Sequence, residues 1–169
     1  MIQQSRLLIS FIFLISFGCF EGSAGTDIEA KVLRIKNSDI QWTAGFSGVA
    51  PEVRGDASKE VLASGVAATP FLIRLLSEKD QYQAAHVLLS TLYQATLRDE
   101  SNVQDIKKAW DRAPHFKANP RAHADPDWSD WNGMRIKFYA HREPVFDIED
   151  RLYLKEQWSE WVAEQQRDK

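Results

Sequence analysis

Cysteine is almost absent from this chain of 169 residues. The one cysteine, Cys19, lies in an apolar stretch near the start, so the chain cannot form an intramolecular disulfide. Stability must therefore come from a packed core. The chain beyond residue 25 has no thiol, which excludes cysteine as a catalytic nucleophile there.

Long hydrophobic runs, phosphate-binding motifs and a strong charge of one sign are also lacking. The longest apolar run, Leu7–Phe17, is well short of the roughly 20 residues that a membrane-spanning helix needs. Neither a P-loop nor a GxGxxG pattern is present, so no nucleotide cofactor is predicted. The net charge of −3 gives no electrostatic reason to expect nucleic acid as a partner.

The first 25 residues have the pattern of a secretory signal peptide. Arg6 precedes the apolar run, and small residues follow it. Cleavage after Gly22-Ser23-Ala24 would release a chain that begins near Gly25. Alternatively, the sequence SFGC is similar to a bacterial lipobox, which would make Cys19 a lipidation site. Both routes predict export to the periplasm or cell envelope, or secretion, with membrane contact only through a lipid on Cys19.

Residues 26–96 are predicted to be mostly helical. A Thr26–Glu29 capping box begins a short helix, although β-branched residues leave a strand open as the alternative. Residues 38–55 contain three glycines and a proline, so we expect a loop. Helical spacing then indicates helices over 56–64, 69–76 and 80–96. Short turns between these helices predict antiparallel packing.

A weak internal repeat occurs in this helical region. ASKEVLAS at 57–64 aligns with AAHVLLST at 84–91, and Gly65, Pro70 and several leucines lie between them. Residues 54–96 thus resemble a HEAT-like, armadillo-type α-helical repeat, a resemblance that implies a binding surface or scaffold. The expected fold is mostly all-α: one domain over 26–169, built as a small stack of antiparallel helical hairpins.

The second half of the chain is expected to hold a long irregular insertion between two helices. A helix is predicted over 101–113 and a C-terminal helix over 147–166. Residues 114–146 between them are rich in proline and lack helical periodicity. Within this insertion, Asn132-Gly133 is a turn signal and the following residues alternate in polarity. Residues 128–142 are therefore interpreted as either a loop or a short β-hairpin.

The candidate functional residues also lie in the 114–146 insertion. Trp128 and Trp131, with Arg135 as a polar rim, are predicted to form an aromatic contact surface. A metal site is the alternative hypothesis, with His115, His123, Asp125 and His141 as the ligands. His86, Trp158 and Trp161 are interpreted as core residues, because each shares a helix face with aliphatic neighbours.

These patterns predict a non-enzymatic exported domain that contacts a protein or ligand in the cell envelope. The prediction depends on the contrast between a regular helical part and an aromatic, irregular insertion, since loops commonly carry binding residues. Two alternatives stay open: a metal-assisted hydrolase that uses the His/Asp cluster, and a purely structural envelope lipoprotein anchored at Cys19.

Overall fold

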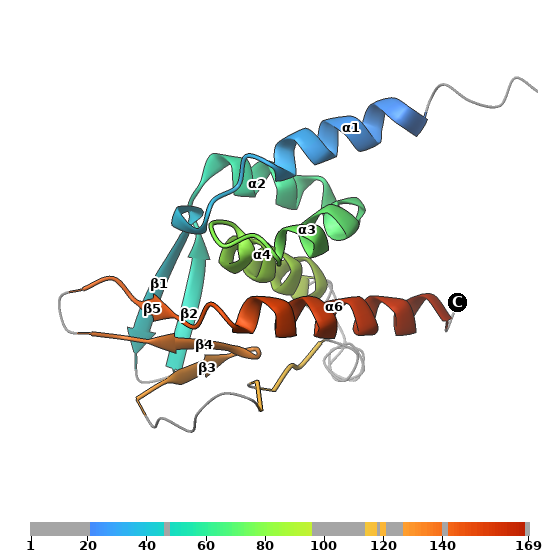
Figure 1. The fold of residues 1–169 in the computed structure, drawn as a ribbon. Coiled ribbons are helices and arrows are strands. Elements are labelled where there is room, and N and C mark those ends of the chain that lie inside the picture. Colours follow the sequence, from blue (N-terminus) through green and yellow to red (C-terminus); the bar gives the residue numbers. More distant parts are fainter. Residues whose placement is uncertain are drawn as a thin grey trace, which may run out of the picture.

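A computed structural model describes residues 21–45, 48–95, 114–117, 119–120, 127–139 and 142–167. Cys19, most of the expected signal peptide and the helix predicted over 101–113 lie outside these ranges. The fold is mixed α/β, which corrects the expectation of a mostly all-α protein, because two small antiparallel sheets accompany the helices (Figure 1). None of the helices in the described ranges is long and apolar enough to span a bilayer.

The helical part is built around one central helix, α4 (Tyr82–Ala95). Residues 84–90 of α4 are all buried, as expected for a helix that is apolar around most of its circumference. Four other helices of the described ranges surround or adjoin it: α1 (Glu21–Val32), α2 (Asp56–Ala63), α3 (Thr69–Leu75) and α6 (Asp150–Arg167). Helices α2, α3 and α6 contact α4 directly, whereas α1 packs on α2 and α3 (Figure 1).

No pair of equivalent helical hairpins is visible in the described residues. The two segments of the internal repeat form α2, of 8 residues, and the middle of α4, of 14 residues. Between them lie the short 3-10 helix Gly65–Ala68 and α3, with Pro70 in its first turn. The similarity to HEAT repeats therefore stays a resemblance in sequence.

Residues expected to be a loop form a β-hairpin. Strands β1 (Ile40–Gly45) and β2 (Gly48–Val53) pair antiparallel, directly after the short 3-10 helix η1 (Asn37–Asp39). Exposure alternates along β1: Ile40 is buried, Gln41 exposed, Trp42 half-buried and Thr43 exposed. The loop prediction is wrong, because the two-residue period of β1 indicates a strand despite the glycines and Pro51 in this segment.

The expected insertion 114–146 contains a three-stranded sheet that belongs to the core. Its strands are β3 (Ser129–Trp131), β4 (Met134–Lys137) and β5 (Val145–Phe146), in the order β3-β4-β5. The β-hairpin interpretation of 128–142 is the one found, since Asn132 and Gly133 join β3 to β4 with positive φ angles of 47° and 88°. Met134 and Ile136 of the central strand are 0% exposed, so this segment is not a free insertion.

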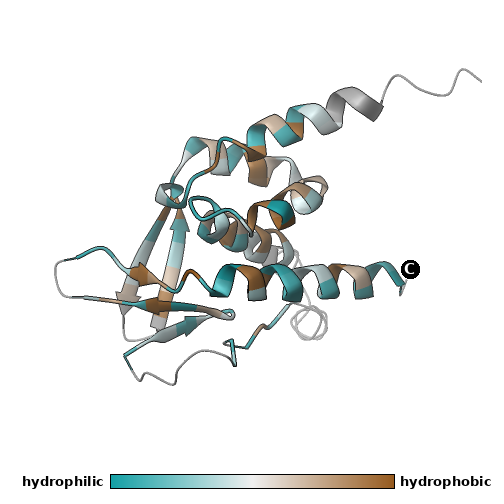
Figure 2. Ribbon diagram, viewed as in Figure 1, coloured by the Kyte–Doolittle hydropathy of each residue, from teal (hydrophilic) through white to brown (hydrophobic). Residues whose placement is uncertain are grey.

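Two clusters of buried residues make up the core. The larger one joins the helices to Ile35, Ile40 and Trp158, and the smaller one joins Tyr82 and Leu154 to the central strand β4. Trp42 and Trp131 pack against both clusters, so they connect the hairpin, the second sheet and the helices. Figure 2 shows the corresponding hydrophobic colour on β4 and β5.

Candidate functional site

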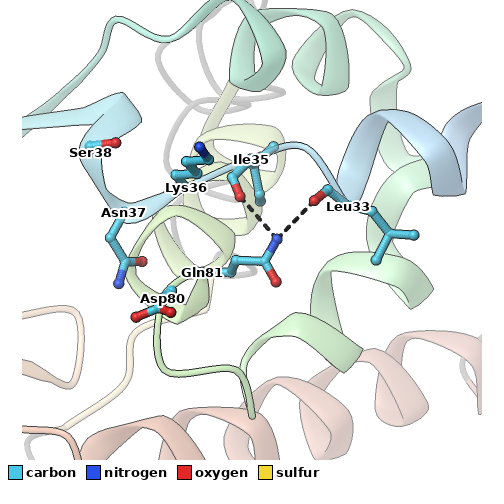
Figure 3. A pocket seen from close by; sticks show the side chains of 7 residues that line it. All are labelled: Leu33, Ile35, Lys36, Asn37, Ser38, Asp80 and Gln81. Atoms are coloured by element: carbon cyan, nitrogen blue, oxygen red, sulfur yellow. Dashed lines mark hydrogen bonds between the residues drawn. The ribbon is translucent and has the colours of Figure 1, made fainter.

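A shallow hollow lies between the end of α1 and the start of α4. Its volume is about 540 Å³, and it is lined by Leu33, Ile35, Lys36, Asn37, Ser38, Asp80 and Gln81 (Figure 3). Gln81 Nε2 donates hydrogen bonds to the carbonyl oxygens of Leu33 (3.1 Å) and Ile35 (2.9 Å), which fixes the backbone between α1 and η1. Lys36 and Asp80 bring one charge of each sign to this 33–38 hollow.

A second hollow of about 480 Å³ lies along β1. It is lined by Asn37, Ser38, Ile40, Gln41, Trp42, Gln83, Glu143, Pro144 and Phe146. The Trp42 and Phe146 rings, with centroids 5.3 Å apart, form its aromatic part. Gln41, Gln83 and Glu143 form its polar part. Because this Trp42 hollow shares two lining residues with the 33–38 hollow, the two adjoin, and we call them together the groove.

Asn37 separates the two hollows and is held firmly by its hydrogen bonds. Its Nδ2 donates to the Lys79 carbonyl oxygen (2.9 Å), and its Oδ1 accepts from the main-chain N–H of Gln83 (3.0 Å) at the first turn of α4. The Asn37 main-chain N–H donates to the Asp80 carbonyl oxygen (2.9 Å). The side chain therefore acts as a helix cap supplied from a distant part of the sequence. Its Oδ1 and one N–H of its Nδ2 are occupied, so it serves the groove as a rigid divider.

Trp42 has one hydrogen-bond donor for which the described residues provide no acceptor. Its indole Nε1 is buried, and no described residue accepts a hydrogen bond from it. A buried donor without an acceptor costs about 1–3 kcal/mol. The indole ring is fixed by an edge contact to Trp131 at 5.4 Å and by Phe146. An aromatic wall with amide groups beside it is suited to bind a polar, elongated molecule.

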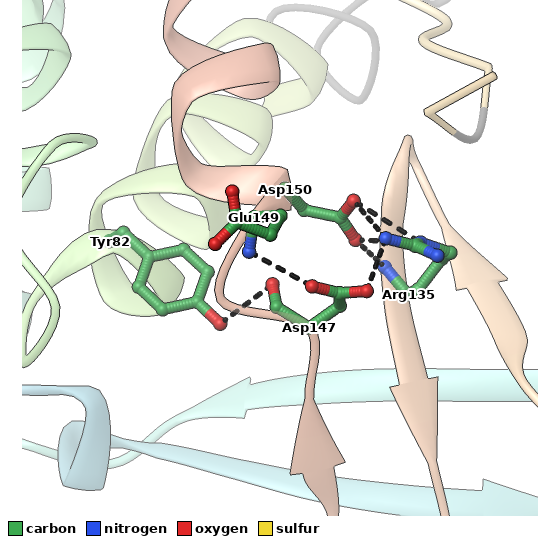
Figure 4. Close-up of polar contacts among 5 residues, drawn as sticks. All are labelled: Tyr82, Arg135, Asp147, Glu149 and Asp150. Carbon is green, nitrogen blue, oxygen red and sulfur yellow. Dashed lines mark hydrogen bonds and ion pairs between the residues drawn. The ribbon is translucent and has the colours of Figure 1, made fainter. Parts of the chain in front are cut away.

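A buried ion-pair network holds the β5 wall of the groove in place. The Arg135 guanidinium contacts Asp150 (Nη2 to Oδ1, 2.9 Å) and also pairs with Asp147, and the Arg135 main-chain N–H donates to Asp150 Oδ2 (2.8 Å) (Figure 4). Asp147 follows β5 directly, and Asp150 begins α6. The network thus fastens the end of β5 and the start of α6 to β4, which positions Phe146 beside Trp42.

The pKa shifts of Arg135 and Tyr82 agree with a buried network that stabilises the fold. Burial alone would lower the pKa of Arg135, but the hydrogen bonds and charges of Asp150 and Asp147 outweigh it and raise that pKa. Burial raises the pKa of Tyr82 to about 12, and the two carboxylates add to this effect. The Tyr82 hydroxyl donates to the Asp147 carbonyl oxygen at 3.4 Å. Arg135 is 8% exposed, so its guanidinium serves the core.

The two tryptophans predicted to form an aromatic surface point to different surroundings. The Cζ atom of Arg135 lies 6.0 Å from the centroid of the Trp128 ring, so this ring covers the ion-pair network. Trp131 packs inward, with its ring edge-on to Trp42 and, at 5.2 Å, to His86. Trp131 is the last residue of strand β3, whereas Trp128 lies just before that strand. The structure therefore does not bring Trp128 and Trp131 together as one exposed platform.

His86 is a neutral core residue. It is 0% exposed, and its Nδ1 accepts a hydrogen bond from the indole Nε1–H of Trp158 at 2.9 Å. The ring proton is therefore on Nε2, which has no hydrogen bond of normal geometry among the described residues. Burial lowers the pKa of His86 to about 3, and nearby backbone groups of Trp131 and Asn132 offset only part of this. The interpretation of His86 as a core residue agrees with these contacts.

The alternative metal ligands are mostly beyond the described residues. His123, Asp125 and His141 lie outside them, as does the lipidation candidate Cys19, and His115 is exposed. Within the ranges that the structure covers, no three His, Cys, Asp or Glu side chains are grouped as metal ligands would be. The groove residues of β1, in contrast, were not predicted. The alternation of Ile40, Gln41, Trp42 and Thr43 was the signal that could have placed them at a strand edge.

Comparisons with family models, curated proteins and solved structures find no match to this chain.

Proposed function

We propose that the protein is an exported, non-enzymatic binding domain of the cell envelope that contacts a protein partner through the groove. The groove itself is the observation that carries this proposal: an aromatic wall with a polar border, beside a strand that pairs with only one other strand among the described residues. Aromatic side chains surrounded by polar groups are typical of protein contact surfaces. Export follows from the signal-peptide pattern of residues 1–25.

The proposal keeps the second half of the chain as a contributor to binding but changes the residues involved. Glu143, Pro144 and Phe146 come from the 114–146 segment and form one side of the Trp42 hollow. The other side comes from β1, far away in sequence. Trp128 and Arg135 belong to the buried network that supports this wall. Binding is therefore assigned to the two sides of this hollow, which are β1 and the end of the 114–146 segment.

Site-specific photo-crosslinking tests this proposal in the organism that produces the protein. A photoreactive residue at the exposed Gln41 position should capture one defined partner in the envelope fraction. The same residue at the exposed Gln166, near the end of α6, is the matched control and should not capture it. Equal capture at the two positions, or none at Gln41, would show that the groove is not the contact surface.

A charge reversal gives a second readout of the same proposal. Glu143→Lys changes an exposed side chain of the groove, so folding should be unaffected and capture at Gln41 should fall at least tenfold. Glu156→Lys, an exposed glutamate on α6, makes the same charge change away from the groove and should leave capture within twofold. Intact mass of the exported protein would also show whether cleavage near Gly25 or acylation of Cys19 occurs.

A further inference from the structure

We infer that the groove takes an extended, basic peptide segment that pairs with β1 as an additional strand. This inference rests on the proposed function and adds the chemistry of the partner and its mode of binding. It depends on three features of the described residues. These are the unpaired outer edge of β1, the shape of the groove, and the charge of Glu143.

The register of the hairpin leaves main-chain groups of β1 facing outward. In an antiparallel pair, facing residues alternate between hydrogen-bonded and non-hydrogen-bonded pairs. Trp42 faces Pro51, and proline has no N–H to donate, so this is a non-hydrogen-bonded pair. The two-residue connection between Gly45 and Gly48 leads to the same assignment. The residues that flank such a turn form a hydrogen-bonded pair, and counting alternate pairs from there makes Trp42–Pro51 a non-hydrogen-bonded pair. The N–H and C=O of Trp42 therefore point away from β2.

This outward edge borders the Trp42 hollow. Gln41 and Trp42 line the hollow from β1, and Pro144 and Phe146 line it from the other side. The Ile40 N–H is already used, because it donates to the Asn37 carbonyl oxygen. A peptide strand beside β1 would bond to Trp42 and place every second side chain against the two aromatic rings. This is the arrangement of β-strand addition, in which main-chain bonds give affinity and side-chain hollows give selectivity.

The shape and charge of the groove indicate more closely which class of molecule binds there. The 33–38 hollow continues from the Trp42 hollow across Asn37 and Ser38, so the groove suits an elongated ligand more than a compact one. Glu143 is the charged residue that lines the Trp42 hollow, and it favours a lysine or arginine on the peptide. A second copy of this chain fits less well, because its own β1 sequence, IQWTAG, has no cationic side chain.

Selection of peptides gives the first test. A phage-displayed library of random linear 12-residue peptides is selected on the purified mature protein. We expect selected peptides to carry lysine or arginine. Their affinity should fall at least tenfold for Glu143→Lys and stay within twofold for Glu156→Lys, with circular dichroism showing that both variants fold. A library that yields no peptide sensitive to Glu143→Lys would overturn the inference.

Backbone chemistry gives the decisive test of strand pairing. N-methylation of successive residues in a selected peptide should weaken binding at least tenfold at alternate positions only, because only every second N–H faces β1. Hydrogen exchange of the Trp42 amide should slow on binding, whereas the Thr43 amide, already paired with β2, should not change. Tight binding without this alternation, or without protection of Trp42, would overturn strand pairing, while cross-linking at Gln41 would still test the proposed function independently. If the free protein forms dimers that the peptide dissociates, a second copy of the chain is the occupant. That result would also overturn the inference of a basic peptide.

Discussion

Lowering the pH from 7 to 5 should destabilise this protein through a single buried histidine. In the folded state His86 is fully buried and its pKa is lowered to about 3. In the unfolded chain the same side chain has a pKa near its ordinary value of 6.5. Between these two values only the unfolded chain binds the proton, so the free energy of unfolding decreases as the pH falls below 6.5.

The size of the effect follows from the two pKa values. At pH 7 about a quarter of the unfolded chains carry the proton on His86, whereas at pH 5 nearly all of them do. One unit of pKa difference corresponds to about 1.4 kcal/mol, so the loss between pH 7 and pH 5 is about 2 kcal/mol. For a domain of this size that equals a decrease of roughly 4–8 °C in Tm. The loss should continue down to about pH 3, where folded His86 begins to bind the proton.

Urea unfolding at the two pH values measures this loss, and His86→Asn isolates the histidine from all other groups. The asparagine Oδ1 can replace Nδ1 as acceptor for the Trp158 indole N–H but does not titrate. This variant should be less stable than wild type at pH 7, because it leaves a gap, and the deficit should shrink by about 2 kcal/mol at pH 5. His115→Asn removes an exposed histidine as the control. An unchanged deficit for His86→Asn would refute the claim that His86 is buried and neutral.

Three further predictions concern the supports of the fold, and all can be measured by urea unfolding at pH 7. Arg135→Gln should cost about 3–5 kcal/mol, because it leaves a fully buried carboxylate unpaired; a cost below about 1 kcal/mol would contradict the network. Gly133→Ala should cost at least about 1 kcal/mol more than Gly65→Ala, because only the first forces a side chain into occupied space. Both positions have positive φ, but only at 133 would the new Cβ lie 2.9 Å from the Phe116 Cβ. Asn37→Ala should cost about 1–2 kcal/mol as the loss of a helix cap, and Asn37→Asp should cost less because it keeps the acceptor.

The helices of this fold could be predicted because their signals are local. Pro70 lies in the first turn of α3, and α4 is apolar on nearly all sides, as a central helix must be. Asp150 begins α6 within three residues of the start predicted for the C-terminal helix. Each of these signals lies within one or two helical turns of the structure it predicts.

The sheets could be predicted only in part, because strand pairing joins distant residues. Residues 38–55 contain three glycines and a proline, and these residue types usually mark loops. Pro51 is accepted within β2 because it faces Trp42 at a pair that needs no hydrogen bond from it. The Asn132-Gly133 turn did indicate a hairpin. Nothing local, however, showed that β4 would become the buried centre of a sheet closed by Val145 and Phe146.

The roles of individual side chains were the hardest to predict from the sequence. Arg135 was expected at the surface, as the polar rim of the Trp128 and Trp131 pair. Its partners Asp147 and Asp150 lie 12 and 15 residues further along the chain, and no helical or strand period links them. The glycines and proline around Trp42 predict a loop, and a loop pattern gives no role to its indole ring. A residue's role at a site depends on which distant segments fold beside it, and one sequence does not encode this as a pattern.

An effect on binding can be distinguished from an effect on stability only with residues at the border of the groove. Trp42, at its centre, is unsuitable for this purpose. Its ring packs against both core clusters, and it also lines the hollow along β1. Removal of a large buried ring costs several kcal/mol of stability, so a Trp42→Ala variant that fails to bind would show nothing about recognition. Gln41 and Glu143 line the same hollow but are exposed, and substitution of such residues usually changes stability by less than about 0.5 kcal/mol. A loss of binding in variants of these two residues can therefore be assigned to the groove itself.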